Sequence, residues 1–149
     1  MKIILSALLV LSFAGCAGMQ KQANIAKAME SYQFNQPAST VYEAAEGKFA
    51  RMLTPLTKVK DFEGVSGWIE SMVDPKMPNA KSRNRFRVVV SAEGKDKSAL
   101  KVYREDEYYQ VSKWSGDVKS LRAGIHEYNV LQALDPAKAQ EIDAAASAK

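Results

Sequence analysis

The stretch from Arg83 to Ala92, RNRFRVVVSA, alternates strongly between basic and apolar side chains. Successive side chains of a β-strand point to opposite faces of the sheet. One face of this strand therefore carries Phe86, Val88 and Val90, and the other carries Arg83, Arg85 and Arg87. A strand with this pattern requires a sheet whose apolar face packs on a core and whose charged face meets water.

A second strand follows this one after a short turn. The turn is EGKDKS, and the strand ALKVYRE has Leu100 and Val102 on its apolar side. If the turn closes near Lys95, three pairs of residues face each other: Arg83–Glu107, Arg85–Glu105 and Arg87–Tyr103. Opposite charges at facing positions stabilise a pair of strands. We expect cross-strand ion pairs at the first two positions and stacking at the third.

The same arginines support a different interpretation. Arg presents a fork of hydrogen-bond donors that suits phosphate oxygens. Arg83, Arg85 and Arg87 are therefore candidate residues for binding a polyanion such as lipid A, with cross-strand ion pairing as the alternative. Under the polyanion hypothesis, Arg85→Glu abolishes polyanion retention and barely changes the melting temperature.

A helix is predicted before these strands. Thr40 and Glu43 have the spacing of a capping box, so we expect a helix from about Val41 to Leu53. Its apolar stripe consists of Val41, Ala45, Phe49 and Met52. The segments LTKVKDF and VSGWIESMV then flank a turn at Glu63 and Gly64, which predicts a hairpin. DPKMPNAKS contains two prolines and is expected to be a loop, and YYQVSKW predicts one further strand.

The C-terminal part of the chain has helical periodicity. Asp117 is a candidate N-cap, followed by the apolar stripe Leu121, Ile125, Tyr128, Leu131 and Leu134. Asp135 and Pro136 end this helix and begin another. The Ala-rich tail has little but Ile142 to bury, so we expect its helix to be loosely held. Together the elements predict an α+β fold, an antiparallel sheet of about four to five strands with an N-terminal helix and a long C-terminal helix packed on one face.

The first residues of the chain have the pattern of a secretory signal peptide. Lys2 supplies a positive charge, and the apolar run of residues 3–13 has the length of a signal-peptide core. This run is too short to span a bilayer as a helix, which takes about 20 residues.

The residues Ala14, Gly15 and Cys16 resemble a bacterial lipobox, with Phe13 at the position where Leu is commonest. The resemblance implies removal of residues 1–15 and acylation of Cys16, and several acyl chains on one residue make a durable membrane anchor. Ala17 in place of Asp implies the outer membrane, on the periplasmic side. The alternative is ordinary signal-peptidase cleavage after Ala17, which discards the cysteine.

The predicted domain organisation follows from these segments. It is a signal peptide (1–15), a lipidated N-terminus and tether (16–35), a single α+β domain (36–134) and a loosely held helical tail (135–149). In architecture alone, the domain resembles the small helix-on-sheet domains of outer-membrane lipoproteins. No cysteine follows Cys16, so the fold must be held by packing without an internal disulfide.

The sequence offers few residues for catalysis. His126 is the only histidine and Cys16 the only cysteine, so the common zinc-binding sets cannot be assembled within one chain. We expect His126 at the surface or at the boundary of the core. Glu105, Asp106 and Glu107 are interpreted as a solvated turn, because neighbouring residues do not form the carboxylate pair of a glycosidase. No catalytic residue, metal or cofactor is expected.

Aromatic residues form the remaining candidate site. Trp68, Tyr108, Tyr109 and Trp114 are candidates for a patch that docks a partner protein or glycan, with cross-strand packing as the alternative. Without residues 1–15, which include Lys2, the chain has 20 basic and 17 acidic residues. This mild balance does not predict a nucleic-acid partner.

The sequence therefore predicts a lipid-anchored periplasmic binding or scaffold protein in cell-envelope assembly or maintenance, without catalysis. Its expected partners are the membrane, through acylated Cys16, and an envelope protein, lipid or glycan. The alternative is a small-ligand or lipid carrier with a pocket between the long helix and the sheet. An envelope hydrolase is the third hypothesis.

Overall fold

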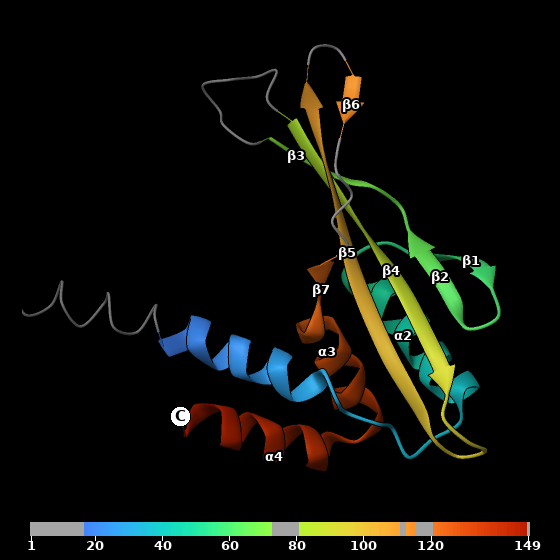
Figure 1. Cartoon of the computed structure of the whole chain (residues 1–149), viewed down its shortest axis with the longest axis vertical. Coiled ribbons are helices and arrows are strands. Elements are labelled where there is room, and N and C mark those ends of the chain that lie inside the picture. The colour runs from blue at the N-terminus through green and yellow to red at the C-terminus, as the bar shows by residue number, and fades with distance from the viewer. Residues whose placement is uncertain (1–16, 73–80, 111–112, 116–120, 149) are drawn as a thin grey trace, which may run out of the picture.

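The computed structural model describes residues 17–72, 81–110, 113–115 and 121–148, which form an antiparallel sheet with helices packed against it (Figure 1). The strands are β1 (Leu56–Lys60), β2 (Glu63–Ser66), β3 (Ile69–Met72), β4 (Lys81–Ala92), β5 (Ser98–Gln110), β6 (Lys113–Ser115) and β7 (Leu121–Arg122). The helices are the N-terminal helix (residues 17–29), α2 (Ala38–Met52), α3 (Gly124–Leu134) and α4 (Pro136–Ser147). The predicted α+β fold is confirmed.

The described part of the sheet is five strands wide, in the order β1-β2-β4-β5-β6. β3 adds no width because it pairs with β4 beyond the end of β2, and β7 likewise pairs with β5 beyond β6. β4 and β5 form the long central hairpin, joined by residues 93–97 as EGKDKS predicts. YYQVSKW is not one strand, because its first residues continue β5 and β6 then pairs back onto them.

Helices α2 and α3 cover one face of this hairpin. The side chains of β4 and β5 that face them are at most 5% exposed, and they are Phe86, Val88, Val90, Leu100 and Val102. Val41, Ala45 and Phe49 of α2 and Leu131 of α3 belong to the same core. Burying one such large apolar side chain contributes about 1.5 to 3 kcal/mol, so the predicted apolar faces hold the helices on the sheet.

Helix α2 begins earlier than the capping box predicts. Its N-cap is Pro37, which makes no side-chain cap, and the backbone N–H of Val41 donates to the Pro37 carbonyl at 3.2 Å. Proline has no N–H to satisfy and its φ is already suited to a helix start, so Thr40 lies inside the first turn. Met52, the last helical residue, is 51% exposed, and the buried stripe therefore ends at Phe49.

The β1–β2 turn lies at Asp61 and Phe62, two residues before the predicted position. Phe62 adopts a left-handed φ of 57° to make it. Gly64 has a different role from the turn residue that we predicted, because a Cβ there would lie 2.5 Å from the Tyr42 hydroxyl. Glycine at this position allows α2 to approach the sheet closely.

The predicted start of the last long helix is also wrong. Leu121 belongs to β7 and is 59% exposed, and α3 begins at Gly124. Asp117, the predicted N-cap, lies outside the described residues. A Cβ on Gly124 would lie 2.9 Å from the backbone of Ala26, so glycine allows α3 to cross the N-terminal helix at close range.

Both ends of the described chain pack onto the domain. Ile25 and Met29 of the N-terminal helix are 3% and 1% exposed, and Ala139 and Ala146 of α4 are 2% and 7% exposed. Asp135 caps α4 as predicted, accepting a hydrogen bond from the Lys138 backbone N–H at 3.0 Å. The segment assigned to the tether and the segment assigned to the loosely held helical tail thus both contribute small and apolar side chains to the core.

Candidate functional site

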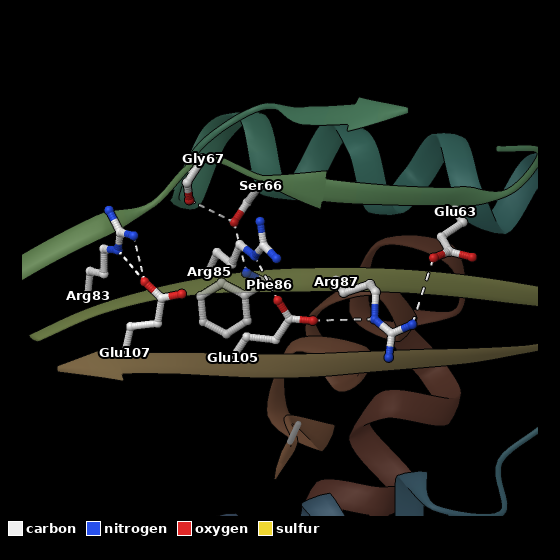
Figure 2. A network of polar contacts seen from close by, with 9 residues as sticks. All are labelled: Glu63, Ser66, Gly67, Arg83, Arg85, Phe86, Arg87, Glu105 and Glu107. Atoms are coloured by element: carbon white, nitrogen blue, oxygen red, sulfur yellow. Dashed lines mark hydrogen bonds and ion pairs between the residues drawn. The ribbon is translucent and has the colours of Figure 1, made fainter. Parts of the chain in front are cut away.

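The face of the sheet opposite α2 and α3, called here the open face, carries the predicted basic row (Figure 2). The register of β4 and β5 pairs Arg83 with Glu107, Arg85 with Glu105 and Arg87 with Tyr103. These are the three pairs that the sequence predicts, and the register is confirmed. The acidic triplet is not a solvated turn, because Glu105, Asp106 and Glu107 are consecutive residues of β5.

Two of the arginines make short ion pairs across the strands. Arg83 Nε donates to Glu107 Oε2 at 2.7 Å, and Arg85 Nε donates to Glu105 Oε2 at 2.7 Å. Glu105 is only 7% exposed, so its ion pairs offset the cost of burying a polar side chain. The predicted ion pairs are therefore present, and they are more buried than the solvated pairs that we expected.

Arg87 is held more loosely than the other two arginines. Its Nε lies 3.6 Å from Glu105 Oε1, and its Nη1 lies 3.8 Å from Glu63 Oε1, both beyond hydrogen-bond distance. Glu63 in turn pairs with Lys60 at 3.0 Å. Charges of alternating sign thus run from Glu105 on β5 through Arg87 on β4 to Glu63 on β2 (Figure 2), and Lys60 extends the row to β1. An incoming polyanion would have to displace carboxylates already paired with the arginines.

Aromatic rings enclose the arginine row. The Arg83 guanidinium lies between two indole rings, 4.5 Å from the Trp68 centroid and 4.3 Å from the Trp114 centroid. Arg85 also lies 4.6 Å from Trp68, and Arg87 lies 5.1 Å from the Tyr103 centroid, as expected from the register. Each such contact contributes about 0.5 to 2 kcal/mol, depending on desolvation. The sequence did not predict that Arg83 lies between two tryptophans. One of them, Trp68, comes from the segment between β2 and β3, and the other, Trp114, comes from β6.

The four candidate aromatic residues do not form one patch. Trp68 and Trp114 contact Arg83, and Tyr109 packs edge-on against Trp114 with 5.4 Å between centroids. Tyr108 follows the alternate phase of β5, which turns it to the other face of the sheet, and it is 50% exposed. The cross-strand packing interpretation therefore describes Tyr109 and Trp114, whereas Trp68 packs on Arg83 from the segment between β2 and β3.

His126 lies at the boundary of the core, as predicted. Its ring packs against Phe86 and Phe49, with centroid distances of 4.5 and 5.7 Å. Burial lowers the pKa of His126 below its usual value, and the positive charge of Arg104 lowers that pKa further. The side chain is therefore neutral at pH 7, which suits an apolar packing role.

A buried ion pair that sequence reasoning missed joins α3 to the N-terminal helix. Glu127 is 0% exposed and accepts hydrogen bonds from the Val102 backbone N–H and from Arg122 Nε, each at 2.9 Å on Oε1. Arg122 Nη2 also donates to Glu127 Oε2 at 2.9 Å. The same guanidinium donates to the carbonyls of Met29 and Glu30, at 3.1 and 3.0 Å, where the N-terminal helix ends. This pair therefore links α3, β5 and the end of the N-terminal helix.

The predicted pocket between the long helix and the sheet is occupied by core side chains, among them Phe86, Val102 and Leu131. A cavity of about 370 Å³ lies elsewhere, between the N-terminal helix and α4. It is lined by Ala17, Gly18, Gln20, Lys21, Ala146 and Ser147.

Three further observations concern the predicted sites. Among the described residues, no group of three or more His, Cys, Asp or Glu side chains is arranged to hold a metal ion. No helix in the described ranges is long and apolar enough to cross a membrane. Cys16, the predicted lipidation site, lies outside the described residues.

Comparisons with protein-family models, with curated proteins and with solved structures found no match to this chain.

Proposed function

We propose that this chain is a lipid-anchored binding or scaffold protein of the bacterial cell envelope that acts without catalysis. The observation that carries the proposal is the docked N-terminal helix. Ala17 directly follows the lipobox-like Cys16, and Ile25 and Met29 of the same helix reach the core. Acyl chains on Cys16 would therefore be joined to the folded domain through a packed helix.

This arrangement supports a function close to the membrane surface. The helix of residues 17–29 rises about 20 Å at 1.5 Å per residue. Its contacts with α4 include the ion pair between Lys21 Nζ and Asp143 Oδ2 at 2.7 Å. A domain carried in this way stays near its anchor, and Ala17 after the cysteine favours the periplasmic side of the outer membrane.

The charges of the open face support binding more than proton transfer. Arg83 and Arg85 each have a carboxylate at hydrogen-bond distance, and stacked rings fix the arginine planes. A general acid or base needs a free proton position in reach of substrate. A surface of paired charges stacked on indole rings is better suited to contact with a partner.

The test of the anchor is intact-mass analysis and membrane fractionation of the wild type, Cys16→Ser and Gly18→Ala. A Cβ at Gly18 meets nothing within 4 Å, so Gly18→Ala is the matched control. We expect acylated residue 16 and membrane association in the wild type and the control, and neither in Cys16→Ser. A wild type that is soluble and cleaved after Ala17 contradicts the anchor.

Two measurements test the binding function. Cross-linking in cells followed by purification should recover a defined complex with an envelope protein, whereas a lipid retained in native mass spectra of the protein favours the carrier alternative. Peptidoglycan turnover that requires the protein and is lost in Glu105→Gln would instead indicate a hydrolase.

A further inference from the structure

The two edges of the sheet differ in how their backbone groups are covered. The outer edge of β5 is paired with β6 at residues 108–110 and with β7 at residues 103–104. The next backbone groups of β5 belong to Val102, whose N–H donates to Glu127 and whose carbonyl accepts from Ala123 N–H at 2.8 Å. Near the start of β5, Ser98 exchanges two hydrogen bonds with Phe34, at 2.8 and 3.0 Å. Hydrogen bonds from four places in the chain therefore cover this edge: β6, β7, the start of α3 and Phe34.

The opposite edge is β1, and nothing in the described ranges covers it. β1 pairs with β2 on one side, and no described strand lies on its other side (Figure 1). Four of its five residues are exposed, and Val59 is 60% exposed. An uncovered edge presents a row of backbone donors and acceptors to which an extended chain can pair.

The side chains of β1 indicate the chemistry of such a chain. Lys58 and Lys60 are 60% and 72% exposed on either side of Val59. Their present partners are Asp61 and Glu63, three residues further along the same hairpin. The Lys58–Asp61 pair is exposed on both sides and contributes at most about 1 kcal/mol, so a carboxylate on an added strand can exchange with Asp61. The Glu63 side chain is only 11% exposed, so Lys60 keeps this partner and contacts a carboxylate on the added strand with its remaining N–H donors.

We propose that β1 accepts an extended, acidic segment of a partner protein as an additional strand of the sheet. Backbone hydrogen bonds provide affinity in this mode of recognition, and alternate side chains provide specificity. The segment carries carboxylates that pair with Lys58 and Lys60. A second copy of this chain fits less well, because pairing β1 with itself brings lysines beside lysines, and like charges at facing positions are destabilising.

This proposal rests on the proposed binding function but not on the lipid anchor. A bulge between Lys58 and Lys60 pairs them with the adjacent residues Gly64 and Glu63, so the two lysines face opposite sides of the sheet. The probe is therefore a nine-residue peptide of three Glu-Glu-Val repeats, which presents carboxylates to both faces, compared with the same peptide carrying Lys in place of Glu. Each is titrated into the purified ¹⁵N-labelled protein at low salt, and amide shifts and hydrogen exchange are followed. We expect slowed exchange in β1 with the acidic peptide, and at least tenfold weaker binding of the basic one.

Charge reversal provides the decisive comparison. Lys58→Glu/Lys60→Glu should reverse the preference to the basic peptide, whereas Lys95→Glu/Lys97→Glu, in the exposed β4–β5 turn, should leave it unchanged. Equal effects of the two double variants, or shifts at Arg85 and Arg87 without protection in β1, would overturn the proposal. A dimer paired through β1 in sedimentation would assign the edge to a second copy. Since the titration is independent of Cys16, its failure is separate from that of the anchor experiment.

Discussion

Removal of the Arg122 side chain should destabilise the protein more than removal of any exposed arginine. In Arg122→Met, the Glu127 carboxylate keeps the Val102 N–H at 2.9 Å but loses both contacts to the guanidinium. Leaving one member of a buried pair without its partner costs about 3 to 5 kcal/mol. Because the Arg122 side chain is 27% exposed, water can enter after its removal, so we expect the lower end, about 3 kcal/mol.

Arg104→Met is the matched control. Arg104 lies on the neighbouring strand, opposite Leu121, and pairs with Asp106 at 2.7 Å. Its side chain is 50% exposed, and such a pair contributes at most about 1 kcal/mol. The free energy of unfolding should be measured by urea denaturation at pH 7, with tryptophan fluorescence and circular dichroism as independent probes.

Adding Glu127→Gln to Arg122→Met should recover part of the loss. The carbonyl oxygen of the introduced glutamine would still accept the hydrogen bond from the Val102 N–H, and the double variant removes the buried charge at this position. We therefore expect it to be more stable than Arg122→Met alone, with a coupling energy of about 1 to 2 kcal/mol. An Arg122→Met variant within about 0.5 kcal/mol of the Arg104→Met control would refute the argument that this pair holds α3, β5 and the N-terminal helix together.

Three further substitutions test the packing described above. Gly124→Ala should lower the free energy of unfolding by about 1 to 3 kcal/mol, because its Cβ overlaps the backbone of the N-terminal helix, whereas Gly47→Ala, with nothing within 4 Å, should raise it by about 0.5 to 1 kcal/mol. Both are measured as urea midpoints. Burial lowers the pKa of His126, so the unfolded chain binds that proton more readily, and stability should fall as pH drops below about 6.5; a His126→Gln variant with the same pH dependence would exclude this cause. Arg85→Glu should lower the melting temperature markedly, contrary to the sequence-based expectation, because it places a second carboxylate beside the buried Glu105; an unchanged melting curve would show that the ion pair is dispensable.

The β4–β5 hairpin was predictable to the residue, and the physical reason is local. A period of two fixes which side chains share a face, and one short turn fixes the register, so Arg85 must meet Glu105 once EGKDKS closes. The start of α3 was not predictable in the same way. Leu121 continues the helical spacing of Ile125 and Tyr128, yet pairing with β5 draws it into β7. Periodicity cannot decide between a helix and an edge strand when a neighbouring strand is available.

Contacts between segments that are distant in the sequence account for the other features of the structure that were not predicted. Nothing near Glu127 in the sequence indicates that its carboxylate meets the Val102 backbone and Arg122. Small residues such as Ala139 and Ala146 give a weak apolar signal, although both are buried, and the Ala146 carbonyl accepts a hydrogen bond from Asn24 of the N-terminal helix at 3.1 Å. The sandwich of Arg83 between two tryptophans likewise needs the whole sheet to be assembled first.

These long-range contacts place the proposed lipid anchor and the proposed docking strand β1 on opposite sides of the sheet. The N-terminal helix and α4 lie on the β5 side of the molecule, and β1 lies on the opposite side of the sheet (Figure 1). Arg122 and Glu127 cover the β5 edge and also hold the helix that follows Cys16. The backbone groups of β5 on the side nearest the proposed anchor are therefore paired. Among the described strands, β1 lies on the opposite side of the sheet from the anchor, and an extended segment of a partner can reach its unpaired side without competing with the membrane.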